Sequence, residues 1–96
     1  MNKTVKINDV VSQVEGNIVS DMDGEKVMLS IQNGKYYNLG EVGGVIWECI
    51  KEPTSIHHLV DSLITQFDVE VNECRIQVIE FLNQLVEEGL IKVETI

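Results

Sequence analysis

The sequence has 96 residues, which is enough for one folded domain and leaves no room for a second core. Its apolar fraction of 44% and charged fraction of 24% are typical of a folded globule. Sixteen acidic residues against seven basic ones give a net charge of −9, which argues against a nucleic-acid backbone or an anionic membrane as a partner.

The first half of the chain has the period-two pattern of β-strands. Ile18 opens one expected strand, and Asp23-Gly24 is a hairpin signal before the next strand, EKVMLSI at 25–31. A second turn at Asn33-Gly34 leads into KYYNL at 35–39. The pattern therefore predicts an antiparallel meander of three strands.

Two further segments have weaker strand signals. The stretch VKINDVVSQV at 5–14 predicts a short strand or an arm, and LIKVETI at 90–96 predicts a closing strand or an ordered tail.

From residue 40 the apolar period changes to 3.6, which predicts three helices. The first ends before Pro53, and Thr54 or Ser55 caps the second. The third runs from about Glu70 to Glu88, and Gly89 ends it. We expect an α+β domain with a three-stranded antiparallel sheet followed by three helices that pack on one sheet face.

Two adjacent glycines, Gly43 and Gly44, interrupt the apolar stripe of the first helix. Each costs the helix about 1 kcal/mol relative to alanine. We expect them to let the helix approach a neighbouring backbone closely, with Trp47 filling the junction between sheet and helices. A flexible hinge is the alternative.

The third helix has more apolar surface than one core contact requires. One flank of its core stripe is polar, and the other flank continues the apolar band through Arg75, Ile79, Leu82 and Val86. This second flank either touches another element of the domain or lines a binding groove.

Catalytic and metal-binding patterns are absent from the sequence. His57 and His58 are adjacent and would point about 100° apart on a helix, so a solvated role is favoured over metal ligation. Cys49 and Cys74 have no CxxC partner and are interpreted as buried thiols in a reducing cytosol, with a disulfide or a catalytic cysteine as alternatives. We therefore expect no cofactor, no metal and no enzymatic activity.

Membrane and DNA-binding roles are also disfavoured. No apolar run approaches the roughly 18 residues of a spanning helix, and the first residues lack a signal-peptide pattern, so we expect a cytoplasmic protein. The third helix carries five glutamates against Arg75 alone, which is the wrong charge for a helix that enters the major groove.

An exposed strand edge is the remaining candidate site. The strand at 35–39 is expected at an edge of the meander, where it can pair with another chain. The apolar flank of the third helix would form the opposite wall of a groove that takes an extended peptide by strand addition.

Several short motifs follow one another along roughly residues 18–92. They comprise Leu39, Gly43, Ile46 and Trp47, then Pro53-Thr54, then Phe67-Asp68-Val69, and finally Phe81-Leu82, Leu85 and Gly89-Leu90-Ile91. Together these motifs resemble those of the PqqD family. Gly40 departs from the usual Asn or Ser, which removes a side-chain cap from the first helix, and Val42 replaces a common hydroxyl residue.

This resemblance implies a winged helix-turn-helix-like fold and a recognition element for ribosomally synthesised, post-translationally modified peptides (RiPPs). Such proteins bind the leader segment of a precursor peptide and deliver it to a maturation enzyme. Free-standing versions of this length resemble those of lasso-peptide systems, whose partners are a leader peptidase and a macrolactam-forming cyclase. A chaperone for a radical-SAM enzyme is the alternative within the family.

We therefore expect residues 1–96 to form a single leader-binding domain, a monomer unless strands are exchanged in a dimer. The leader would dock antiparallel on Lys35–Asn38, and only one of Tyr36 and Tyr37 would face it. Arg75 would pair with a leader carboxylate or with Asp68. The expected peptide-binding residues are Lys35, Tyr36, Tyr37, Asn38, Arg75, Ile79, Leu82 and Val86. A winged-helix regulator and an enzyme that uses Cys74 are the alternatives from other functional classes.

Overall fold

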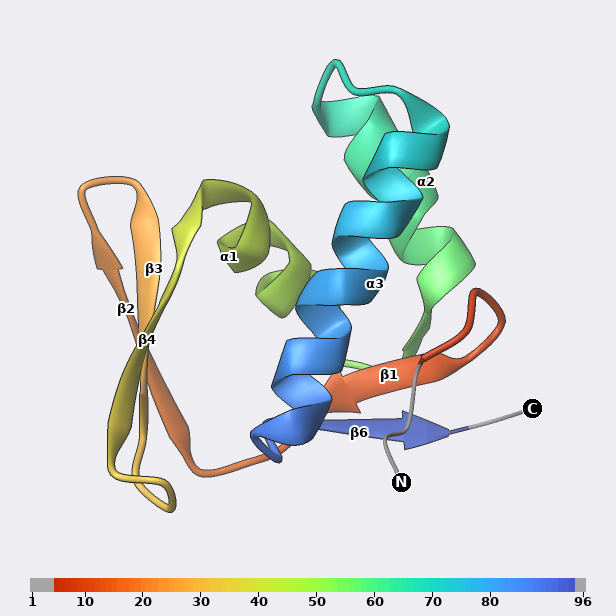
Figure 1. Cartoon of the computed structure of the whole chain (residues 1–96). Helices are drawn as coiled ribbons and strands as arrows, with labels where there is room; N and C mark the ends of the chain where they lie inside the picture. The colour runs from red at the N-terminus through yellow and green to blue at the C-terminus, as the bar shows by residue number, and fades with distance from the viewer. Residues whose placement is uncertain (1–4, 95–96) are drawn as a thin grey trace.

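The computed structural model of the chain describes residues 5–94, which form two small antiparallel sheets and three helices (Figure 1). In chain order the elements are β1 (Val10–Gln13), β2 (Asn17–Met22), β3 (Glu25–Ser30), β4 (Lys35–Leu39), α1 (Gly40–Cys49), β5 (Thr54–Ser55), α2 (Ile56–Gln66), α3 (Val71–Glu87) and β6 (Ile91–Glu94). The predicted α+β fold with an antiparallel meander followed by three helices is confirmed.

The meander consists of β2, β3 and β4 in that order. Asp23 and Gly24 both have positive φ, 55° and 85°, as the tight two-residue hairpin between β2 and β3 requires. A longer loop joins β3 to β4, and in it the N–H of Gly34 donates to the carbonyl of Ser30 at 2.8 Å. Both predicted turns therefore lie where the sequence places them.

The second sheet joins segments that are far apart in the sequence. β1 is its central strand and pairs with β5 on one side and β6 on the other, so that Val10 lies opposite both Ser55 and Glu94. The segments at 5–14 and 90–96 thus both contribute strands. For each segment, a strand was one of the two predicted alternatives. Their mutual pairing, and the short strand β5, were not predicted.

The helix ends follow the expected capping chemistry. The Ser55 hydroxyl accepts a hydrogen bond from the N–H of His58 at 3.1 Å at the start of α2, and the Glu70 carboxylate accepts from the N–H of Glu73 at the start of α3. Gly89 follows α3 with φ of 73°. No side chain caps α1, as expected for Gly40, although the Asn38 amide oxygen accepts from the Gly40 N–H.

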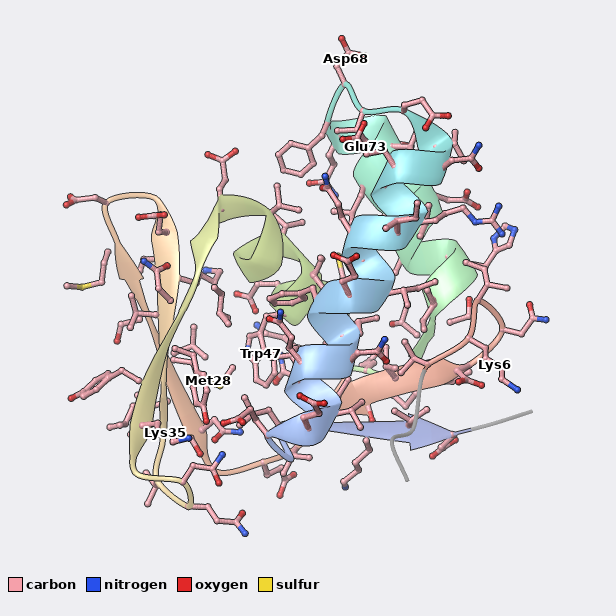
Figure 2. The ribbon with its side chains drawn as sticks, viewed as in Figure 1. Lys6, Met28, Lys35, Trp47, Asp68 and Glu73 are labelled. Carbon is pink, nitrogen blue, oxygen red and sulfur yellow. The ribbon has the colours of Figure 1, made fainter. Side chains whose placement is uncertain are left out.

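The core lies between the meander, the second sheet and the three helices. Met28 and Trp47 are buried, and Figure 2 shows Met28 on the side of the meander that faces α1 and Trp47. Met28 and Ser30 form the buried side of β3, whereas Val27 and Leu29 on the other side are only half-buried. None of the helices between residues 5 and 94 is long and apolar enough to span a bilayer.

Candidate functional site

The outer edge of β4 is open to pairing. β4 is the last strand of the meander, and no other strand between residues 5 and 94 pairs with it on the side away from β3. An edge strand presents unpaired N–H and C=O groups, which are a template for a further strand. The edge from Lys35 to Leu39 is the first component of the site.

At one end of β4, polar contacts join the strand to the C-terminal end of α3. Tyr37 lies on the inner side of the meander, and its hydroxyl donates to the Glu88 carboxylate. Lys35 Nζ lies 3.7 Å from Oε1 of the same carboxylate, and Asn33 Nδ2 donates to the Glu88 backbone carbonyl at 2.9 Å. The Tyr37 hydrogen bond, and then the positive charge of Lys35, lower the pKa of Glu88.

At the other end of β4, where α1 begins, an apolar pocket of about 230 Å³ opens between α1 and α3. Val42 and Val69 are 44% and 42% exposed at its walls, so apolar surface there is accessible to a ligand. The pocket is lined by Val42, Gly43, Ile46, Leu63, Phe67, Val69, Cys74, Gln77, Val78 and Phe81.

Gly43 and Gly44 explain how closely α1 packs. A Cβ on Gly43 would lie 3.0 Å from two atoms of the Phe81 ring, and a Cβ on Gly44 would lie 2.8 Å from Cγ of Lys26. The glycines are a packing device, as predicted. What they accommodate is the Phe81 ring of α3 at Gly43 and the Lys26 side chain of β3, from its Cβ outward, at Gly44.

The predicted line on α3 does not face β4. Leu82 is fully buried in the core and offers no surface to a ligand. Ile79 and Val86 lie about one turn on either side of Asn83, whose amide oxygen accepts from the N–H of Val5 at 2.9 Å. These two half-buried side chains therefore pack toward the segment before β1.

Arg75 also lies on this other side of α3. It lines a small cavity together with one residue of the segment before β1, three of α2 and one at the start of α3 itself, namely Ile7, His57, Val60, Asp61 and Val71. The prediction that Arg75, Ile79, Leu82 and Val86 form the second wall of a groove beside β4 is thus corrected, because the N-terminal segment and α2 cover that flank.

The opposite flank of α3 is the one that faces α1 and β4. Gln77 and Phe81 line the pocket, and Glu88 bonds to Tyr37. The sequence marked this flank as the polar one. The spacing of 77, 81, 84 and 88 places these four residues on one face of the helix, and this spacing could have identified the face. It was overlooked because most of these side chains are polar.

The four predicted residues of β4 divide between the two sides of the meander. Lys35 and Tyr37 point inward toward α3, and Figure 2 shows Lys35 at the lower end of the strand. Tyr36 pairs with Leu29 on the outer side and is 74% exposed. Asn38 is also on the outer side. Of the two tyrosines, Tyr37 is the one that faces α3.

The histidines, cysteines and carboxylates of residues 5–94 lie as follows. No group of three or more His, Cys, Asp and Glu side chains between residues 5 and 94 could hold a metal ion. Both cysteines are free thiols, with Cys74 buried and Cys49 half-buried. His57 Nδ1 lies 3.3 Å from the Asp61 carboxylate, and both histidines are exposed.

The chain is similar to known proteins in its sequence profile and in its fold. The profile of the family described as coenzyme PQQ synthesis protein D (PqqD) matches residues 25–91. No curated protein matches the sequence. The fold is similar to that of TbiB1 in complex with the TbiA(beta) leader peptide, with a TM-score of 0.75, 25% identity, and coverage of 84% of this chain and 94% of that one.

Two further solved structures share the fold at lower identity. A lasso peptide synthetase B1 complexed with the leader peptide has a TM-score of 0.73 and 18% identity over 85% of this chain and 96% of that one. The stand-alone PqqD portion of Methylobacterium extorquens PqqCD, a RiPP recognition element, has a TM-score of 0.72 and 10% identity over 86% of this chain and 88% of that one.

Proposed function

Because the chain belongs to the PqqD family, whose profile spans β3 to the start of β6, we propose that it captures the leader segment of a ribosomal precursor peptide. The leader adds a fourth strand to the meander at the β4 edge. The protein then delivers the precursor to a leader peptidase and a cyclase of lasso-peptide maturation, without catalysing a step itself.

The free edge of β4 beside α3 is the observation that carries this proposal. A strand added there obtains its affinity from main-chain hydrogen bonds to Lys35–Leu39, and these bonds are largely independent of the leader's sequence. Selectivity comes from alternate side chains, which point into the groove toward α3.

The two ends of the groove favour different leader side chains. The pocket walled by Val42 and Phe81 fits an apolar side chain, whose burial contributes about 1.5–3 kcal/mol for a residue of the size of valine to phenylalanine. At the other end, Lys35 and Glu88 offer polar partners. A leader with an apolar anchor at one end of its bound segment is therefore the expected ligand.

The similarity to TbiB1, which was solved with a leader peptide, supports leader binding. The choice of lasso-peptide enzymes as recipients rests on the resemblance to free-standing members of the family. A non-catalytic role is supported by the burial of the Cys74 thiol, because burial raises the pKa of that thiol and so disfavours the nucleophilic thiolate.

The decisive experiment is fluorescence anisotropy with a labelled synthetic leader from the precursor of the same biosynthetic system. We expect a dissociation constant in the micromolar range or tighter. Val42→Asp places a charge at the pocket wall and should weaken binding at least tenfold, about 1.4 kcal/mol. The fold should persist, because Val42 is in the first turn of α1, where a carboxylate is favoured.

Ile76→Asp is the matched control, since Ile76 is an exposed apolar residue on α3 outside the groove. It should leave leader affinity unchanged. Absence of leader binding by the wild-type protein, or equal affinity of the Val42→Asp and Ile76→Asp variants, would contradict the proposed site.

A further inference from the structure

The second sheet has an open edge that is separate from the edge of β4. Its strand order is β5-β1-β6, and no strand between residues 5 and 94 pairs with β6 on the side away from β1. In Figure 1 neither a helix nor a strand lies beyond β6 on that side. The edge runs over Ile91–Glu94 and is available to a further strand.

The hydrogen bonds of β1 show which way the backbone groups of β6 point. The N–H of Val14 donates to the carbonyl of Leu90, which precedes β6, at 3.0 Å. The N–H of Ile56, which follows β5, donates to the carbonyl of Asp9 at 3.0 Å. Because backbone groups alternate in direction along an antiparallel strand, the even-numbered residues of β1 bond toward β6 and the odd-numbered ones toward β5.

Val93 is therefore the residue of β6 that offers its backbone to a new partner. The even-numbered Ser12 pairs with Lys92, so the N–H and C=O of Lys92 point toward β1, as do those of Glu94 two residues later. The N–H and C=O of Val93, between them, point away from β1. Val93 thus presents one donor and one acceptor at the open edge.

The side chains of the edge carry opposite charges on one face. Lys92 and Glu94 are exposed, whereas Ile91 is buried and Val93 is half-buried against the core. Neither Lys92 nor Glu94 forms an ion pair with another residue of the range 5–94. A lysine and a glutamate two positions apart are complementary to an antiparallel copy of the same strand.

We propose that β6 pairs antiparallel with β6 of a second copy of this chain, about a two-fold axis at Val93, and so joins the two second sheets into one. The two Val93 residues exchange both of their backbone hydrogen bonds. On each side of them, Lys92 of one copy lies opposite Glu94 of the other. These flanking pairs are of the non-hydrogen-bonded type, whose Cα atoms are about 4.5 Å apart, and this closer spacing favours the two ion pairs.

The charges select this register over its neighbours. The next registers that also align the outward-pointing backbone groups are displaced by two residues. One displacement places Lys92 opposite Lys92, the other places Glu94 opposite Glu94, and like charges directly opposite each other are destabilising. The net charge of −9 on each copy opposes association at long range, so we expect a reversible dimer with a small interface.

Sedimentation equilibrium of the full chain, at concentrations from about 10 µM to about 1 mM, measures the dissociation constant of this dimer. Lys92→Glu places glutamates opposite each other and should raise the dissociation constant at least tenfold. The double variant Lys92→Glu/Glu94→Lys reverses both pairs without changing the net charge and should restore wild-type association. Lys51→Glu is the matched control, because it changes the net charge equally at an exposed lysine outside the second sheet.

Amide hydrogen exchange of the wild-type protein tests the register. Exchange at Val93 should slow as the protein concentration rises, whereas exchange at Lys92, whose N–H points toward β1, should not. Three results would overturn the proposal: a wild-type monomer throughout the concentration range, a dimer that Lys92→Glu and Lys51→Glu weaken equally, or a dimer that dissociates when leader saturates the β4 edge. The first two leave the proposed function untouched, and the third would place the dimer interface at β4.

Discussion

Gly43 of α1 faces the ring of Phe81 on α3 so closely that a Cβ on Gly43 would lie 3.0 Å from Cε1 and Cζ of that ring. This contact joins the two helices at the wall of the apolar pocket. Because both residues line the pocket, the proposed function predicts that a change at Gly43 alters leader binding as well as stability.

Gly43→Ala should change the free energy of unfolding by less than about 1 kcal/mol. The gain of about 1 kcal/mol in helix propensity is offset by displacement of the half-buried Phe81 ring. The displaced ring narrows the pocket, so leader affinity should fall severalfold. Urea denaturation and fluorescence anisotropy measure the two effects, and a variant stabilised by the full 1 kcal/mol with unchanged affinity would show that the ring is not confined.

Gly44→Ala should instead destabilise the fold by about 1–2 kcal/mol in urea denaturation. Its Cβ would lie 2.8 Å from Cγ and 3.1 Å from Cβ of Lys26, atoms so near the β3 backbone that strand and helix must separate. In a double-mutant cycle, Lys26→Ala removes the clashing Cγ, and Gly44→Ala should then cost measurably less. Additive effects of the two substitutions would contradict this packing.

Tyr37→Phe should lower stability at neutral pH by an amount that shrinks in acid. The folded pKa of Glu88 is below its ordinary value because the Tyr37 hydroxyl donates to it and Lys35 lies nearby. Such a carboxylate stabilises the fold above its unfolded pKa, about 4.3, and the contribution is lost as the pH falls through the lower folded value. Thermal melts from pH 7 to pH 3 measure the stability difference between the wild type and Tyr37→Phe. In a Glu88→Gln background, the effect of Tyr37→Phe should no longer depend on pH.

Ile79→Asp should unfold or strongly destabilise the protein, by about 2–3 kcal/mol, because it places a charge where α3 packs toward the segment before β1. Circular dichroism during urea denaturation measures the loss. A well-folded Ile79→Asp variant that fails to bind leader would show that the flank of Arg75, Ile79 and Val86 lines the leader site after all.

Cys49 should react with iodoacetamide before Cys74 in the native protein. Cys74 is buried, and its burial raises the pKa of its thiol, so little reactive thiolate forms near pH 8. Mass spectrometry of partially alkylated protein measures the order. Cys74→Ala should retain leader binding and maturation activity; loss of activity in a folded variant would revive the alternative of an enzyme that uses this thiol.

Local signals in the sequence predicted the meander and the helix ends well. The turn at Asp23-Gly24 requires two positive φ angles, which few dipeptides adopt. Ser55 and Gly89 cap helices through hydrogen bonds to residues close to them in the sequence. Each of these features depends on residues a few positions apart, so the chain's pattern carries the information by itself.

The second sheet and the groove wall depend on contacts that no local pattern encodes. Val10 pairs with Glu94, which lies more than eighty residues later in the sequence, so the pairing forms only when the chain folds back on itself. In the same way, the period of α3 revealed surplus apolar surface beside the core. It could not reveal that the segment holding Val5 covers one flank and that Phe81 on the other flank meets Gly43.

The pairing of β1 with β6 also has a consequence for biosynthesis. The hairpins of the meander close over short spans and can form while the chain is still being translated, whereas β1 obtains β6 as a partner only after residues 91–94 have been synthesised. The β4 edge can therefore assemble before the second sheet, which is complete only once β6 has paired with β1.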